Sequence, residues 1–173
     1  MELFIIELTT VFLNENIDLD PTFQEVDIMT NILIVKDEVH IEATPSKVWE
    51  VLINPKYIAQ WDELPENYPS ENMSKGSKVV WEHPNGDQTV TTIIKAEELK
   101  ELKLALYSSN WEVKPNEGDV AYLFKLEDLN GSTLLKIEIG DFSLLKDGQD
   151  YYDASVEFAS EAKKVIKELA GSL

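Results

Sequence analysis

The stretch VHIEATPSKVWEVLINPKYIAQW, residues 39–61, decides the fold that the rest of the chain follows. It begins with alternating apolar and polar residues, a pattern typical of a strand with one buried face. Thr44 is then the predicted N-cap of a helix, and Pro45 occupies its first position, where a missing N–H is not needed. Asn54-Pro55 ends that helix, because proline disfavours helical geometry in the residue before it. The apolar spacing after this break predicts a second short helix.

The remainder of the chain predicts antiparallel strands followed by one long helix. Asn85-Gly86 and Asn130-Gly131 each separate two alternating segments and indicate hairpins, the first with a type I′ turn. The helix is predicted from an N-cap at Asp150 to about Ala170. Since each strand has one apolar face that must be covered, we expect an α+β fold in which about six antiparallel strands pack against the terminal helix. The further strands are expected at residues 77–84, 89–97, 102–106, 120–127 and 133–139.

The opening stretch also resembles a known family. Its pattern V-x-I-x-A-x-P-x-x-V-W-x-x-L over residues 39–52, followed by Asn54-Pro55 and Trp61, is similar to the start of the START/Bet v-type (SRPBCC) superfamily. Within that superfamily the chain looks most like the branch named after the activator of the heat-shock ATPase. The resemblance covers residues 34–173. It implies a helix-grip fold, in which a curved antiparallel sheet wraps around the long C-terminal helix and leaves a cavity between them.

The first residues differ in composition from the rest of the chain. Residues 1–30 contain seven acidic and no basic side chains. One interpretation is that Met29 is the biological start and that the preceding residues are a tail or an upstream reading. The other is a short additional strand, Leu3–Leu13, on a sheet edge. We therefore expect an acidic N-terminal extension over residues 1–30 and a helix-grip domain over residues 31–173.

The composition excludes several classes of function. The formal charge is −18, from 33 acidic residues against 15 basic ones, all of them lysine. Such a chain repels phosphate, so we expect no nucleic-acid binding and no attraction to anionic membranes. The absence of cysteine excludes disulfides and thiolate chemistry. No apolar run is long enough for membrane insertion, and the N-terminus lacks the features of a secretory signal, so a cytoplasmic protein is expected.

The candidate site is the cavity that the resemblance implies. Ser155 and Ala162 are small residues on the helix face expected to meet the sheet, and small residues leave room where a packed core would need bulk. An apolar pocket with a few polar groups is typical of a small-molecule site. Each aromatic candidate has a second interpretation as a core residue, and His83, close to a hairpin turn, has a second interpretation as an exposed histidine. The candidate ligand-binding residues are Trp81, His83, Thr92, Ser108, Tyr122, Phe124, Ser155, Phe158 and Ala162.

Three functions remain open from the sequence. The first is binding of a hydrophobic or aromatic small molecule, as the lipid, steroid and polyketide binders of the superfamily imply. The second is a cavity-based cyclase or hydrolase, for which His83 with Tyr107 or Tyr122 would have to supply acid–base groups. The third is a chaperone-associated interaction module, for which residues 1–30 are too short to replace the separate N-terminal domain of the co-chaperone.

No cofactor or metal is expected. Two groups of carboxylates could take a hard cation, since such ions prefer oxygen ligands. Neither matches the spacing of a calcium-binding EF-hand loop. We interpret both groups as solvated surface: Asp62, Glu63 and Glu66, and Asp147, Asp150 and Asp153.

Overall fold

Residues 32–173 are the part of the chain that the structure, a computed structural model, describes. They belong to a single compact unit. Both interpretations of residues 1–30, the extra strand Leu3–Leu13 and the tail before Met29, fall outside the described residues.

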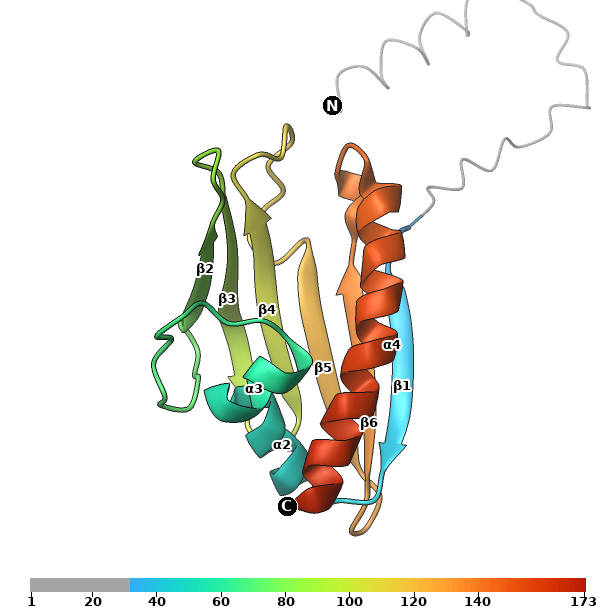
Figure 1. Cartoon of the computed structure of the whole chain (residues 1–173). Coiled ribbons are helices and arrows are strands. Elements are labelled where there is room, and N and C mark those ends of the chain that lie inside the picture. The colour runs from blue at the N-terminus through green and yellow to red at the C-terminus, as the bar shows by residue number, and fades with distance from the viewer. Residues whose placement is uncertain (1–31) are drawn as a thin grey trace, which may run out of the picture. The chain divides into compact units, whose positions relative to one another are not determined.

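The described unit contains one sheet of six antiparallel strands (Figure 1). Its order is β1-β6-β5-β4-β3-β2, so the first two strands of the described residues form the two edges. With the helix pair after β1 and the long C-terminal helix on the sheet, this confirms the α+β fold predicted from the sequence. The strands are β1 (Val35–Ile41), β2 (Lys78–Glu82), β3 (Gln88–Glu97), β4 (Glu101–Ser108), β5 (Ala121–Asp128) and β6 (Thr133–Gly140).

The helix pair follows β1 as the sequence predicts. Helix α2 (Pro45–Ile53) has Thr44 as its N-cap and a proline at its start, although the Thr44 side chain makes no capping hydrogen bond. Asn54 ends α2 and also begins α3 (Pro55–Trp61), where its side chain accepts a hydrogen bond from the Lys56 N–H. One residue therefore stops one helix and caps the next, because the following proline keeps it extended.

The C-terminal helix α4 runs from Gly148 to Ser172 and begins before the predicted N-cap at Asp150. Its N-cap is Asp147, which has a left-handed φ of 58°. Gly148 then lies directly against the backbone of Phe142, in the short helix η1 (Phe142–Leu144), and a Cβ on Gly148 would overlap the Phe142 carbonyl oxygen. The prediction of Asp150 as the N-cap is therefore wrong. The start of α4 depends on the contact between Gly148 and Phe142, which the local sequence pattern does not show.

The two hairpin turns that the sequence indicates differ in geometry. Asn130 and Gly131 have φ values of 60° and 114°, both positive as a type I′ turn requires. In the β2–β3 hairpin only Gly86 has a positive φ, so the predicted type I′ turn is wrong there. The Gly86 N–H instead donates to the His83 carbonyl across Pro84 and Asn85. A proline at the second turn position fixes a negative φ, which excludes type I′.

Helix α4 does not cover the whole sheet. It packs mainly against β1, α2, α3 and η1, and in Figure 1 it runs along β6 and β1. Its buried face consists of small residues and one isoleucine, so the helix approaches its neighbours closely. The inner face of β2, β3 and β4 is left to α3 and the segment after it. The buried residues of α4 are Gly148, Ser155, Ala159, Ala162, Ile166 and Ala170.

Candidate ligand-binding cleft

A cleft lies over the part of the sheet that α4 leaves free. Strands β2, β3 and β4, with Tyr122 of β5, form its floor, and α3 with the segment after it forms its wall. The enclosed volume is about 120 Å³. The lining is mostly apolar and consists of Leu52, Ile58, Trp61, Asp62, Glu63, Leu64, Met73, Val79, Trp81, Thr89, Thr91, Ile93, Leu102, Leu104, Leu106 and Tyr122.

Strand alternation decides which side chains reach the floor. Trp81 pairs with Thr89, and Val79 pairs with Thr91, so these four side chains lie on one face of the β2–β3 hairpin. The same parity continues onto β4, where Thr91 pairs with Leu106. Two threonines on the floor are shorter than the leucines beside them.

Aromatic rings form the walls. Trp61 is held by a hydrogen bond of 3.1 Å from its indole Nε1 to the Val51 carbonyl. Its ring meets Phe124 edge-on at a centroid distance of 5.7 Å and lies 6.5 Å from Phe158. Phe158 in turn meets Tyr122 edge-on at 5.7 Å. Such edge-to-face contacts are a favoured arrangement of aromatic rings.

The cleft continues outward into a wider and more open hollow. This outer hollow has a volume of about 500 Å³ and shares Trp61, Asp62, Glu63 and Trp81 with the inner cleft. Phe158 of α4 is added to its lining. The shared residues therefore form the mouth of the inner cleft.

Two polar groups in the cleft influence one another. Asp62 lies at the mouth, where it keeps contact with water while protein atoms surround its other sides. This partial burial raises its pKa above the usual 3.8, against the lowering effect of a hydrogen bond from the Glu63 N–H. Deeper inside, burial and the charge of Asp62 raise the pKa of Tyr122 to about 12. The Tyr122 hydroxyl makes no hydrogen bond within residues 32–173, so it is a protonated donor available to a ligand.

The charges around the cleft have one sign. Within residues 32–173, Asp62 and Glu63 are the only charged side chains that line either hollow, and no lysine lines them. An anionic ligand would therefore meet repulsion at the mouth, whereas a neutral or cationic one would not.

The structure places three of the predicted site residues in this cleft. Trp81 and Tyr122 line the inner part, and Phe158 lines the outer part. His83 lies at the β2–β3 hairpin tip, exposed, with its Nε2 2.9 Å from the Thr89 hydroxyl. Thr92 pairs with Lys78 on the opposite face of the sheet and lines a different hollow.

The other four predicted residues are buried and do not line the cleft. Phe124 is 1% exposed and lies behind Trp61. Ser155 and Ala162 belong to the buried face of α4. Ser108 is buried at the end of β4, where its hydroxyl donates to the Asn110 side chain at 2.7 Å.

Sequence reasoning missed Trp61, Asp62, Thr89 and Thr91 as cleft residues. The two threonines could have been found by counting the β2–β3 loop as five residues, His83–Asp87, which sets the parity of β3. Trp61 and Asp62 depend on the angle between α3 and the sheet, for which no local signal exists. Tyr107, proposed as an acid–base group, pairs with Val90 and is 45% exposed on the outer face.

Residues 42–170 match the family model described as "Activator of Hsp90 ATPase homolog 1-like protein". The chain belongs to this family, and the resemblance inferred from its opening stretch is confirmed. Comparison with curated proteins finds no match.

Solved structures with the same fold have low sequence identity to this chain. Protein MLL2253 from Mesorhizobium loti is 18% identical with a TM-score of 0.59, over 79% of this chain and 95% of that one. The Aha1 dimer from Colwellia psychrerythraea is 15% identical with a TM-score of 0.55, over 78% and 96%. Protein Ms6760 from Mycobacterium smegmatis is 16% identical with a TM-score of 0.56, over 81% and 91%. These similarities establish the fold.

Neither a membrane-crossing helix nor a metal-binding cluster is found in the described chain. None of the helices within residues 32–173 has the length and apolarity to cross a bilayer. Within the same residues, no three acidic, histidine or cysteine side chains gather closely enough to hold an ion.

Proposed function

We propose that this domain binds a hydrophobic small molecule with an aromatic part in the cleft between Trp61, Trp81 and Tyr122. The observation that supports this most directly is the combination of the aromatic rings of Trp61, Trp81 and Tyr122 with two threonines on an otherwise apolar floor. Small-molecule sites are mostly apolar and contain a few placed polar groups, which here are the Tyr122 hydroxyl and Asp62.

The volume of the inner cleft limits how much of a ligand can enter it. Typical ligand pockets measure roughly 300–1,000 Å³, whereas the inner cleft measures about 120 Å³. The ligand would therefore insert one ring between Trp81 and Tyr122 and place the rest of its body in the outer hollow of about 500 Å³. Each Å² of apolar surface removed from water contributes about 25 cal/mol, so burial of the inserted ring contributes to the affinity.

The charges at the mouth select among apolar ligands. Asp62 and Glu63 disfavour a carboxylate or sulfonate on the ligand, and they favour a neutral or positively charged one. The Tyr122 hydroxyl donates to an oxygen or nitrogen acceptor on the inserted part. The proposed ligand is thus a neutral or cationic aromatic compound with one hydrogen-bond acceptor.

A matched pair of fluorescent probes tests this proposal. N-phenyl-1-naphthylamine is neutral, and 8-anilino-1-naphthalenesulfonate has the same rings with a sulfonate. We expect the neutral probe to bind, to quench the tryptophan fluorescence and to raise the melting temperature. The sulfonate is expected to bind about tenfold more weakly because of the carboxylates at the mouth. Binding of neither probe, or tighter binding of the sulfonate, would contradict the proposal.

Two variants test whether the probes bind in the cleft. Trp81→Leu removes an aromatic wall and is expected to weaken the neutral probe about tenfold, since large aromatic contacts dominate such sites. Asp62→Asn is expected to reduce the preference for the neutral probe over the sulfonate. Glu168→Gln is the matched control, because it removes an equal charge at an exposed residue that lines neither hollow.

A second candidate function is acid–base catalysis in the same cleft. It is supported by Asp62, whose pKa is raised by burial, and by the protonated Tyr122 in the same cleft. Once a ligand has been found by thermal shift, mass spectrometry of the incubated mixture tests for a product. Turnover that is lost in Asp62→Asn while binding remains would favour catalysis, and an unchanged ligand would exclude it for that compound.

A further inference from the structure

Aromatic rings and carboxylates meet at the mouth of the cleft. Trp61 and Trp81 line both the inner cleft and the outer hollow, and Phe158 lines the outer hollow. Asp62 and Glu63 directly follow Trp61 in the chain and line the same two hollows. One group bound at the mouth would therefore contact aromatic side chains and negative charge together.

The two carboxylates have no positive partner in the described part of the chain. No lysine or histidine of residues 32–173 forms an ion pair with Asp62 or Glu63. The only hydrogen bond that the Asp62 side chain accepts within these residues comes from the Glu63 N–H, at 2.8 Å. Partial burial also raises the pKa of Asp62, so its ionised form is incompletely compensated. A positive charge on a ligand would supply the missing compensation.

The aromatic side chains select among positive charges. The face of an aromatic ring attracts a cation, and tryptophan does so most strongly. An ammonium with free N–H groups is strongly hydrated and needs acceptors to replace its water molecules. A fully methylated ammonium has no N–H, and its methyl groups can lie directly against Trp61, Trp81 and Phe158. The lining of the outer hollow therefore favours the methylated form.

The outer hollow is large enough for such a group. A trimethylammonium has four non-hydrogen atoms. With about 30 Å³ for each, the volume of one water molecule in the liquid, it needs about 120 Å³. The outer hollow measures about 500 Å³. The inner cleft of about 120 Å³ remains for the apolar part of the ligand.

We propose that the ligand carries a methylated ammonium group, which binds at the mouth of the cleft against Trp61, Trp81 and Phe158 and beside Asp62 and Glu63. This inference rests on the proposed function. It narrows the charge of the ligand from neutral or positive to a permanent positive charge on a group without N–H. The apolar part of the same ligand enters the inner cleft.

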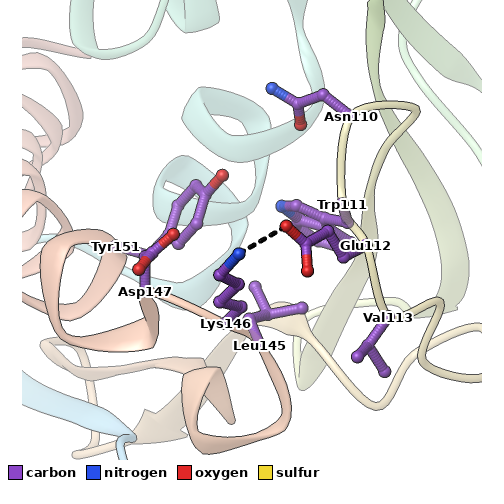
Figure 2. Close-up of a pocket in the computed structure, with 8 residues that line it drawn as sticks. All are labelled: Asn110, Trp111, Glu112, Val113, Leu145, Lys146, Asp147 and Tyr151. Atoms are coloured by element: carbon purple, nitrogen blue, oxygen red, sulfur yellow. Dashed lines mark hydrogen bonds and ion pairs between the residues drawn. The ribbon is translucent and has the colours of Figure 1, made fainter.

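Indole N–H correlation spectra of the isotope-labelled full chain test this site. Of the four tryptophans, Trp61 and Trp81 line the mouth. Trp49 and Trp111 are 7% and 6% exposed and line neither the cleft nor the outer hollow, so their signals are internal controls. Trp111 lies against Tyr151 beside a separate hollow, as Figure 2 shows. Sequential assignment identifies the four signals without any variant.

Three small molecules separate charge from methylation. Choline carries the trimethylammonium group, 3,3-dimethylbutan-1-ol has the same shape with carbon in place of the charged nitrogen, and ethanolamine has the charge without the methyl groups. Choline is expected to shift the Trp61 and Trp81 signals with saturation. Each of the other two is expected to bind about tenfold more weakly, because one lacks the charge and the other lacks the contacts to the rings.

Two variants locate the group at the mouth. Trp81→Leu removes a ring and Asp62→Asn removes a charge, and each is expected to weaken choline several-fold. Asp62→Asn should leave the binding of 3,3-dimethylbutan-1-ol unchanged, since that molecule is neutral. Glu168→Gln removes an equal charge at an exposed residue outside both hollows and should change neither.

N-phenyl-1-naphthylamine separates failure of this inference from failure of the proposed function. If that probe binds in the cleft while choline shifts no signal with saturation, the inference is overturned and the proposed function stands. The same holds if 3,3-dimethylbutan-1-ol or ethanolamine binds as tightly as choline, or if the Trp49 and Trp111 signals shift as much as those at the mouth. If neither N-phenyl-1-naphthylamine nor choline binds, both proposals fail.

Discussion

The two sides of the sheet's inner face, one along β1 and β6 and the other along β2, β3 and β4, are covered in different ways. On the side of β1 and β6, α4 packs through Ala159, Ala162 and Ala170, which have between 0 and 2% of their surface exposed. On the side of β2, β3 and β4, the cover is the shorter α3, and the floor contains Thr89 and Thr91. Small residues therefore close one side and open the other. Their effect depends on whether a helix packs directly against them.

This contrast corrects the role that the sequence predicts for the small helix residues. Ser155 and Ala162 were expected to hold the helix away from the sheet and leave a cavity. In the structure they belong to the buried face on which α4 packs, and the cleft lies where α4 is absent. We expect the first side to contribute more to stability, and we propose the second for binding; the following variants test this contrast.

The largest effect on stability is expected when a buried side chain of α4 is truncated. Ile166 on α4 has no exposed surface, and Ile166→Ala should lower the free energy of unfolding by about 3 kcal/mol, through lost burial and the cavity left behind. The matched control is Leu104→Ala in the half-buried lining of the cleft, where solvent or relaxation can fill the space. Urea denaturation measures both. Equal losses would remove the distinction between the two sides.

Adding side-chain volume, instead of removing it, tests the same distinction between the two sides. Ala162→Leu adds volume on the closed side and should destabilise the domain by about 1–3 kcal/mol. Thr91→Val adds no comparable volume and lies on the floor of the cleft, so its effect should stay within about 0.5 kcal/mol. A well-tolerated Ala162→Leu in thermal and urea unfolding would indicate free space beneath α4, contrary to the structure.

An ion pair between α4 and β1 is expected to contribute less. Lys163 Nζ lies 2.6 Å from an Asp37 carboxylate oxygen, and each side chain is 25% exposed. Lys163→Met should lower stability by about 1 kcal/mol, and a double-mutant cycle with Asp37→Asn isolates the pair. The comparison pair on the same helix is Lys164 with Glu161, whose side chains are 57% and 73% exposed. Removing the Lys164–Glu161 pair should change the free energy of unfolding negligibly. A larger effect there than at Lys163 would contradict the account.

The smallest effect is expected from the ionisation of Asp62. Because its pKa is raised above 3.8 in the folded state, its favourable contribution is complete below that pH and is lost as the pH rises through the folded value. Asp62→Asn should therefore melt at a slightly higher temperature than the unmodified chain at pH ~7, with no such gain at pH ~3. Thermal unfolding at both pH values measures this. A lower melting temperature of Asp62→Asn at neutral pH would show that partial burial does not disfavour the ionised carboxylate.

The fold could be predicted from the sequence because its signals are local. The Asn54-Pro55 break, the Asn130-Gly131 turn and the strand alternation each depend on neighbouring residues, and the structure contains all three. The start of α4 was misplaced because it depends on Gly148 meeting Phe142, a contact that the local sequence does not reveal.

The site was less predictable for the same reason. Thr92 was chosen where Thr91 faces the cleft, since the parity of β3 depends on a loop that was treated as a two-residue turn. Trp61 was recognised only as part of a helix, because its role as a wall depends on how α3 meets the sheet.

The most direct test of the central claim is to locate N-phenyl-1-naphthylamine on the protein by intermolecular nuclear Overhauser effects. The account predicts contacts from its rings to the side chains of Trp81, Tyr122 and Phe158. Contacts confined to the surface of α4, to the outer face around Tyr107, or to Trp111 would contradict it, because the open side of the sheet would then not be the side that binds.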